Sequence, residues 1–296
     1  MAKPNLLIVG AAKSGTTSLH NYLNQHVDVF MCNPKEPHFL INNEIGIDRI
    51  PIGVTKQDEY ENLFLEGSEL KYRGESSVMY LMYPEIATKN IKKYLGEDTK
   101  IIIMLRNPVE RAYSGYQHVK RYNVKEDLTD FKTAWEISEE RYFINKSMTP
   151  ASRYKELGLY YKQVKYFMEE FQNLHIIIYE DYKSDFQSEI NKVFDFLGIE
   201  RIDINSEEKH MVGGWQWEND SMKKLMMKKN PIKSLFKFLF PFESLRKKIR
   251  KNIQKRNTIV VASISDEDEQ MLKQFYHEDV RKLSDLLGRD LNHWTK

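Results

Sequence analysis

A short loop near the start of the chain has residue types and spacing that favour anion binding. Gly10 and Gly15 bracket a loop that carries Lys13. Hydroxyl side chains gather in the loop and just after it, at Ser14, Thr16, Thr17 and Ser18. Backbone N–H groups at a helix N-terminus, hydroxyl donors and an ammonium group together bind phosphate or sulfate. The stretch therefore favours an anion site over an ordinary strand-to-helix turn.

The loop differs from the magnesium-dependent loop that binds nucleoside triphosphates. That motif, GxxxxGK[ST], places lysine directly after its second glycine, followed by a hydroxyl residue that holds Mg²⁺. Here Thr16 follows Gly15, and Lys13 lies two residues before that glycine. The loop retains the means to hold a phosphate, but metal-dependent ATP chemistry is disfavoured and no metal is expected.

A second candidate anion site follows the most apolar run of the chain, at residues 100–105. Arg106 stands directly after that run, and Ser114 lies eight residues further along. A guanidinium group can donate two parallel hydrogen bonds to a terminal phosphate dianion. In a doubly wound sheet the loops at the carboxyl ends of strands collect along one edge, where one ligand touches several of them. A nucleotide with two phosphate groups would match, one on the glycine loop and the other on Arg106.

Apolar runs and helical patterns predict the elements that must position these loops. Strands are predicted at residues 6–9, 29–31, 72–77, 100–105 and 174–179. Helices are predicted after the glycine loop and at residues 57–64, 84–95, 108–122, 130–143, 159–171, 186–197 and 266–287. Gly198 and Gly288 are expected to end the last two of them.

The alternation of strands and helices predicts an α/β fold. We expect a single domain over residues 1–296, with a central parallel sheet flanked by helices and a helical C-terminal region. The loop at residues 33–40 is expected to be held extended by Pro34 and Pro37. Residues 41–56 show no clear periodicity.

Composition narrows the classes of function. The net charge of +2 gives no reason to expect a nucleic-acid partner. Cys32 is the only cysteine, so a disulfide framework and a clustered zinc site are disfavoured, and a small core residue is expected. No run of about 18 apolar residues is present, and the N-terminus leaves no room for a cleaved signal peptide. A cytoplasmic protein is the expectation.

The segment at residues 222–256 is strongly basic. It holds thirteen lysines and arginines against one acid, Glu243, with leucines and phenylalanines between them. Such a helical segment suits an anionic polymer or an anionic membrane at the inner face, to which the protein would be peripheral. A solvated hairpin packed on the core is an equal alternative. If the segment recruits the acceptor, replacing Lys247, Lys248, Arg250 and Lys251 with Gln raises the acceptor KM.

Two motifs together resemble those of the sulfotransferase family, which uses 3′-phosphoadenosine 5′-phosphosulfate. Residues 13–17 (KSGTT) are similar to the motif that grips the 5′-phosphosulfate, and residues 106–116 (RNPVERAYSGY) to the motif that grips the 3′-phosphate. Residues 35–39 (KEPHF) are similar to the segment that supplies the catalytic glutamate in heparan-type carbohydrate sulfotransferases. Residues 75–81 and the ends of two helices also resemble the family, bacterial members included, so the resemblance covers nearly the whole chain.

The resemblance implies a P-loop-like nucleotide-binding fold and a role for each matching residue. Lys13 would stabilise the leaving phosphate, and adenosine 3′,5′-bisphosphate would be the product. Glu36 would be the general base that takes the acceptor proton, with His38 as helper or alternate. The cofactor contacts would be residues 13–18, Arg106 and Ser114. Lys209 matches the late cofactor-binding loop loosely, and Ser76 stands where the family often has lysine.

These observations leave three alternative functions. The first is a sulfotransferase that acts on a hydroxyl or amine, with a carbohydrate or glycolipid acceptor favoured by the acidic base and the basic segment. The second is a nucleotide-dependent phosphoryl transferase (a kinase) with a variant P-loop. The third is a non-catalytic protein that binds a polyanion or a membrane through residues 222–256 and shows a steep salt dependence. The oligomeric state stays open.

Overall fold

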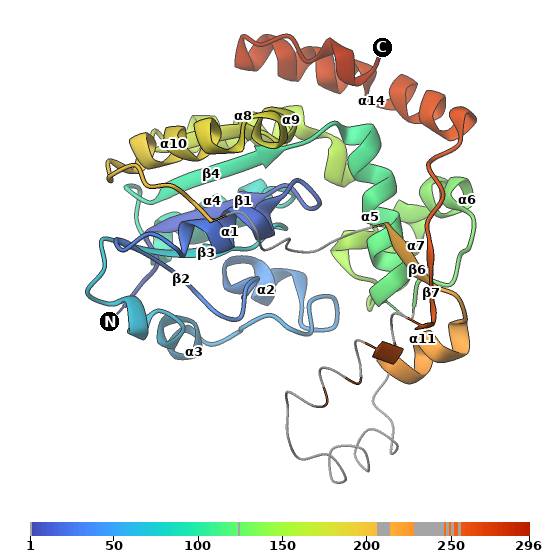
Figure 1. The fold of residues 1–296 in the computed structure, drawn as a ribbon, viewed down its shortest axis with the longest axis horizontal. Helices are drawn as coiled ribbons and strands as arrows, with labels where there is room; N and C mark the ends of the chain where they lie inside the picture. The colour runs from blue at the N-terminus through green and yellow to red at the C-terminus, as the bar shows by residue number, and fades with distance from the viewer. Residues whose placement is uncertain are drawn as a thin grey trace.

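A five-stranded parallel sheet forms the centre of the molecule (Figure 1). The structure, a computed structural model, describes residues 2–123, 125–205, 214–227, 246, 249, 252, 253 and 256–296. The strands are β1 (Leu6–Gly10), β2 (Val29–Met31), β3 (Tyr72–Ser76), β4 (Lys100–Leu105) and β5 (Leu174–Ile178). Their order is β2-β3-β1-β4-β5, and every neighbouring pair is parallel. The predicted α/β sheet is confirmed.

The strand order creates the place where a ligand binds in such folds. From β1 the chain builds β2 and β3 on one side of the sheet and β4 and β5 on the other. The loops after β1 and β4 therefore leave the same sheet edge side by side, at a topological switch point. The N–H of Ala11 in the first loop donates to the carbonyl of Met104 in β4 at 2.6 Å.

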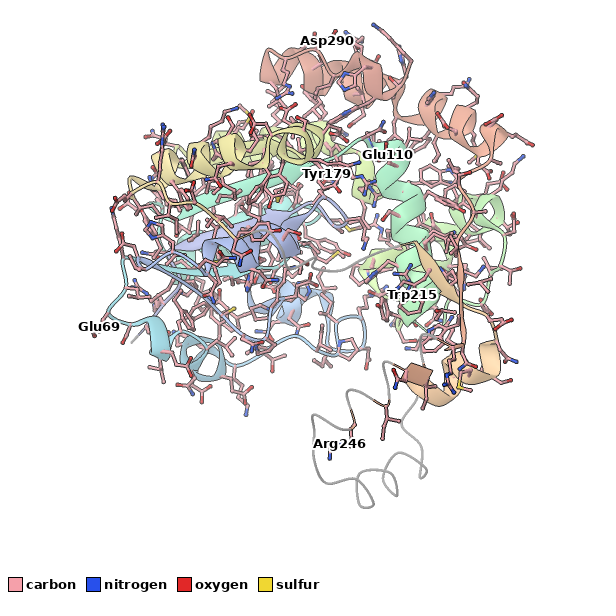
Figure 2. The ribbon with its side chains drawn as sticks, viewed as in Figure 1. Glu69, Glu110, Tyr179, Trp215, Arg246 and Asp290 are labelled. Carbon is pink, nitrogen blue, oxygen red and sulfur yellow. The ribbon has the colours of Figure 1, made fainter. Side chains whose placement is uncertain are left out.

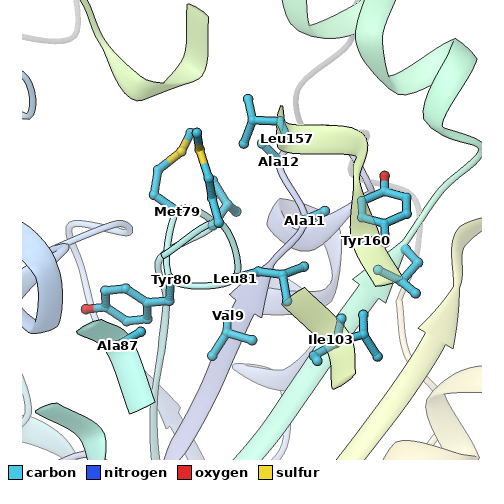
Figure 3. Close-up of a cluster of buried hydrophobic side chains, with 14 of the residues drawn as sticks. Val9, Ala11, Ala12, Met79, Tyr80, Leu81, Ala87, Ile103, Leu157 and Tyr160 are labelled. Atoms are coloured by element: carbon cyan, nitrogen blue, oxygen red, sulfur yellow. The ribbon is translucent and has the colours of Figure 1, made fainter. Parts of the chain in front are cut away.

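Helices cover both faces of the sheet, because alternate strand residues point to opposite sides. On one face Leu6 and Ile8 of β1 pack under α1 (Thr16–Leu23) and α10 (Phe186–Leu197). On the other face Leu7 and Val9 belong to a core with α4 (Pro84–Tyr94), α5 (Pro108–Tyr122) and α8 (Tyr160–Glu170), and α14 (Asp266–Leu287) packs outside them on α8 and α5. Figure 3 shows part of this second core, where Val9 lies near Leu81 and Ile103.

All but one of the predicted helices are confirmed, with small changes at their ends. Gly198 and Gly288 adopt left-handed conformations that cap α10 and α14, as expected. Residues 57–64 form the shorter α3 (Gln57–Asn62). The expected helix at 130–143 is wrong, because the chain forms α6 (Phe131–Glu136) and α7 (Ser138–Ile144) with Ile137 between them in a non-helical conformation.

The expectation of an extended loop at residues 33–40 is also wrong. Glu36 and His38 have φ angles of 66° and 52°, in the left-handed region that most residues avoid. Helix α2 (Phe39–Ile45) begins directly after them. Most of this helix falls within residues 41–56, where the sequence showed no clear periodicity. Lys35 and His38 contact the Glu36 carboxylate, and the Ser77 hydroxyl accepts from the His38 N–H. Such left-handed conformations concentrate at functional sites.

A small antiparallel ribbon packs beside the C-terminal end of α5 (Figure 1). It pairs β6 (Trp215–Trp217) with β7 (Thr258–Val260), and α11 (Asp220–Met227) follows β6. Helix α9 (Tyr179–Ser184) follows β5 directly. Most of the basic segment at 222–256, including all four lysines and arginines named above for substitution, lies outside the described residues, as does Lys209.

Within the described part of the chain, no helix combines the length and apolar character needed to cross a bilayer. The same residues contain no group of three or more His, Cys, Asp or Glu side chains placed to hold a metal ion. Cys32 is free and fully buried, as expected for a small core residue.

Candidate active site

The glycine loop between β1 and α1 is built as an anion cradle. Gly15 is the N-cap of α1 with φ 89°, and no side chain caps this helix. The N–H of Ser18 donates to the Gly15 carbonyl, so the N–H groups of Thr16 and Thr17 are the ones left for a ligand. A Cβ atom on Gly15 would lie 3.0 Å from the Tyr179 ring, so the loop needs glycine here. The Ser14 hydroxyl is buried and has no hydrogen-bond partner among the described residues. An orphaned donor beside free N–H groups fits a phosphate ligand.

Helix α5 carries the second half of the site on one face. It begins at Pro108, and Asn107 caps it by accepting a hydrogen bond of 2.9 Å from the N–H of Val109. Arg106 stands just before this cap. The residues that share a face with Ser114, at spacings of three or four, are Glu110, Ser114, His118 and Arg121. The helix thus lines these side chains up from its first turn to its last.

Lys13 joins the two halves of the site. Arg106 Nη1 donates to the backbone oxygen of Lys13 at 3.2 Å. At the other end of the same residue, Lys13 Nζ lies 3.5 Å from His118 Nδ1. The expectation that the loops after β1 and β4 meet at one sheet edge is confirmed. Helix α5 adds a further contact to the first loop through His118.

Burial and neighbouring charge act on this contact. Burial, with smaller contributions from Arg121 and Arg106, lowers the pKa of Lys13 to about 8. Burial, followed by the charges of Lys13 and Arg121, lowers the pKa of His118 to about 3. His118 is therefore a neutral imidazole at neutral pH, able to accept from the Lys13 ammonium group. A bound anion would relieve the repulsion between Lys13, Arg106 and Arg121.

Arg106 forms an ion pair with a carboxylate of helix α5. Its Nε and Nη2 atoms donate to one carboxylate oxygen of Glu110, at 3.2 and 2.6 Å. The guanidinium carbon lies 4.8 Å from the centre of the Tyr179 ring. Figure 2 shows Glu110 and Tyr179 at the same end of α5. Glu110 is more than half exposed, so a phosphate group competes with a solvated carboxylate for this arginine.

Glu36 lies in a short charged cluster. Its carboxylate is 2.8 Å from Lys35 Nζ and 3.4 Å from His38 Nε2. Burial acts to raise the pKa of Glu36, but Lys35 and His38 together hold it well below its usual range. The charge of Glu36 in turn acts to raise the pKa of Lys13 and His118. The structure thus brings Glu36 and His38 to the same electrostatic neighbourhood as the glycine loop.

The buried carboxylate of Glu75 is linked through Ser77 to the backbone of His38. Glu75 accepts hydrogen bonds from Tyr60 at 2.7 Å, from Tyr80 at 2.8 Å and from Ser77 at 2.5 Å. The Ser77 hydroxyl also accepts from the backbone N–H of His38 at 3.0 Å. Burial raises the pKa of Glu75, while the three hydroxyl donors oppose that shift. This network anchors the backbone of His38 in its left-handed conformation.

All the predicted site residues that the structure describes lie near the glycine loop. Residues 13–18, Arg106, Ser114, Glu36 and His38 all belong to the neighbourhood just described, whereas Lys209 lies outside the described residues. Sequence reasoning missed Lys35, His118 and Arg121. The helical spacing of His118 and Arg121 from Ser114, four and seven residues, was a signal that would have found both.

Comparisons with known proteins agree on the family. A family model described as a sulfotransferase domain matches residues 3–284. The chain is 26% identical over 245 residues to carbohydrate sulfotransferase 15 of Homo sapiens, covering 66% of this chain and 44% of the relative. It is 26% identical over 201 residues to heparan sulfate glucosamine 3-O-sulfotransferase 3B1 of Homo sapiens, covering 67% of this chain and 47% of the relative. The chain thus spans less than half the length of these relatives.

A solved structure is similar over the whole chain. The crystal structure of a sulfotransferase from Alicyclobacillus acidocaldarius has 26% sequence identity and a TM-score of 0.72, and the similarity covers 100% of both chains. The resemblance of the two sequence motifs and the arrangement of the sheet therefore lead to the same family.

Proposed function

The chain belongs to the sulfotransferase family, and from that premise we propose that it transfers a sulfuryl group from 3′-phosphoadenosine 5′-phosphosulfate to an acceptor hydroxyl or amine. Sulfuryl transfer forms a bond from sulfur to the acceptor atom and breaks the bond from sulfur to the 5′-phosphate oxygen. The acceptor proton goes to a base, and negative charge grows on the leaving phosphate. Adenosine 3′,5′-bisphosphate is then the second product.

The observation that carries this proposal is the double contact of Lys13. Arg106 holds its backbone oxygen, and His118 contacts its ammonium group. In the proposed complex Arg106 and Ser114 bind the 3′-phosphate, and residues 13–18 bind the 5′-phosphosulfate. Lys13 stabilises the charge that develops on the leaving phosphate, which is the usual task of a preorganised cation.

Glu36 is the proposed general base. Lys35 and His38 keep its carboxylate ionised, so it is ready to accept a proton across the neutral pH range. The same two partners make it a weaker base than an isolated carboxylate. His38 is the proposed helper, because its Nε2 faces Glu36 while its buried Nδ1 has no partner among the described residues.

The acceptor is proposed to be a carbohydrate or a glycolipid. Two relatives carry names that refer to carbohydrate and to heparan sulfate glucosamine, which supports a sugar acceptor for this chain. Contact of residues 222–256 with an anionic membrane or polymer, and a cytoplasmic location, stay predictions from the sequence, and so does the extent of the domain over residues 1–296.

The decisive experiment pairs donor binding with transfer. Calorimetry compares adenosine 3′,5′-bisphosphate with adenosine 5′-monophosphate, and a labelled phosphosulfate donor is then offered with a panel of glycans, glycolipids and phenols. We expect 3′-phosphate-dependent binding and transfer of label that survives excess chelator. Transfer of phosphate from ATP that collapses in chelator would instead support the kinase. Binding of polyanions without any nucleotide dependence would support the non-catalytic alternative.

A further inference from the structure

Arg121, in the last turn of α5, is a buried cation whose charge is balanced by no acid among the residues that the structure describes. Within the described residues it forms no ion pair, whereas Arg106, Arg141 and Arg153 each pair with a carboxylate at 2.7 Å or less. Its residue is 4% exposed. A buried charge without a counter-ion is costly, and such a cost is retained where a ligand supplies the missing charge.

The β6–β7 ribbon holds the Arg121 side chain in one orientation. Arg121 Nε donates to the backbone oxygen of Trp215 at 2.7 Å, and the guanidinium carbon lies 4.4 Å from the centre of the Trp215 ring. In return, the indole N–H of Trp217 donates to the backbone oxygen of Arg121 at 3.1 Å. A planar guanidinium stacked on an aromatic ring is preorganised to fork onto an oxyanion.

Position along α5 separates Arg121 from the donor contacts. The helix has 15 residues, so it is about 22 Å long. Arg106 stands before its first turn, Ser114 lies near its middle and His118 contacts Lys13 one turn before Arg121. Figure 2 shows the same direction, with Glu110 by the first turns and Trp215 by the last. Arg121 therefore lies beyond Lys13, on the side away from the proposed 3′-phosphate site.

We propose that Arg121, held against Trp215, is a specificity-determining residue that binds a carboxylate or sulfate group of an acidic acceptor next to the atom being sulfated. The inference rests on the proposed function, because a sulfuryl group in line with the leaving phosphate is attacked from the opposite side. That opposite side of Lys13 is where Arg121 stands. The charge of Arg121 also lowers the pKa of Lys13, so an acceptor anion would offset the repulsion between these two cations.

The test measures acceptor binding rather than turnover. A polysaccharide that contains uronic acid, the same polymer with its carboxyl groups reduced to alcohols, and a sulfated form of the reduced polymer are titrated into the enzyme saturated with adenosine 3′,5′-bisphosphate. The wild-type protein should bind the uronic acid or the sulfated form about 10-fold or more tightly than the neutral one. The two acidic arms show whether carboxylate or sulfate is the preferred group.

The variants are Arg121→Gln and, as a matched control, Lys120→Gln. Lys120 is the preceding residue and donates to the carbonyl of Thr129, away from the Arg121 stack. Arg121→Gln should abolish the preference for acidic polymers and Lys120→Gln should preserve it. Because the acidic and neutral polymers are titrated into the same sample, their ratio does not depend on how much of a variant is folded. Arg121→Lys, which keeps the charge without the fork, should retain part of the preference.

Two outcomes would overturn the inference. One is equal binding of acidic and neutral polymers by the wild-type protein. The other is a result in Arg121→Gln that takes either of two forms. In the first form the variant keeps the preference for acidic polymers. In the second form it loses bisphosphate affinity as strongly as polymer affinity, which would place the guanidinium on the donor. Failure of the wild-type protein to bind the bisphosphate would be a different result, because it contradicts the proposed function itself.

Discussion

Nζ of Lys13 lies 3.5 Å from Nδ1 of His118, although 105 residues separate them in sequence. One residue belongs to the loop after β1 and the other to the third turn of α5. The contact joins the proposed 5′-phosphosulfate cradle to the helix that begins at the proposed 3′-phosphate site. Burial keeps the imidazole neutral and makes the ammonium group easier to deprotonate.

Lys13→Ala should mainly depress turnover, because the charge on the leaving phosphate is greatest in the transition state; about 10²-fold or more is expected. The wild-type affinity for adenosine 3′,5′-bisphosphate should also depend on pH. The protonated lysine binds phosphate, and its pKa in the free protein is about 8, so affinity is constant below that pH and falls above it. Calorimetry over about pH 6.5 to 9.5, roughly the span of one titration, should show this fall in the wild type and lose it in Lys13→Ala. The same fall in both proteins would contradict the assignment.

Arg106→Ala should weaken nucleotides that carry a 3′-phosphate and leave those without it little changed. Glu110→Gln should act in the opposite direction, because the exposed carboxylate competes for the same guanidinium nitrogens. A gain of about 2- to 5-fold in bisphosphate affinity is expected from removing an exposed ion pair. Calorimetry with both nucleotide types measures both effects. Equal losses for the two nucleotides in Arg106→Ala would remove Arg106 from the 3′-phosphate site.

Glu36→Gln should lower turnover by about 10²-fold or more with nearly unchanged donor affinity, as expected for the loss of a general base. The acid limb of the wild-type pH–rate profile should lie below the usual range of a glutamate, because Lys35 and His38 depress the pKa of Glu36. Lys35→Met removes the ammonium group of this cluster, so it should move that limb to higher pH. If Glu36→Gln keeps wild-type turnover, the carboxylate is not the base and His38 becomes the candidate.

Glu75→Gln should reduce both stability and turnover while leaving bisphosphate affinity unchanged. A glutamine offers one acceptor oxygen where the carboxylate receives three hydroxyl donors, and an unsatisfied buried group costs about 1–3 kcal/mol. Thermal melting and steady-state kinetics measure the two effects. Tyr60→Phe is the matched control, since it removes one donor to Glu75 but keeps the Ser77 link to His38. Full turnover in Glu75→Gln would show that this network does not position His38.

Local patterns in the sequence were enough for most of the fold. Apolar runs identify buried strands such as β4, and Pro108 after Asn107 marks the start of α5, because these signals depend on nearby residues alone. The same locality explains the errors. The left-handed Glu36 is held by Lys35 and His38, and His38 is held by Ser77, a residue 39 positions away that no local pattern reveals.

The candidate site likewise has residues that local motifs reveal and contacts that they do not reveal. Its motif residues, Lys13, Arg106 and Ser114, could be recognised from the sequence because the spacing within each motif follows from one loop or one helix. Whether Lys13 reaches His118, whether Glu110 occupies Arg106, and whether Arg121 lacks a carboxylate partner within the described chain depend on strand order and on how the β6–β7 ribbon meets α5. Those relationships are set by packing between distant segments, so only the tertiary structure decided them.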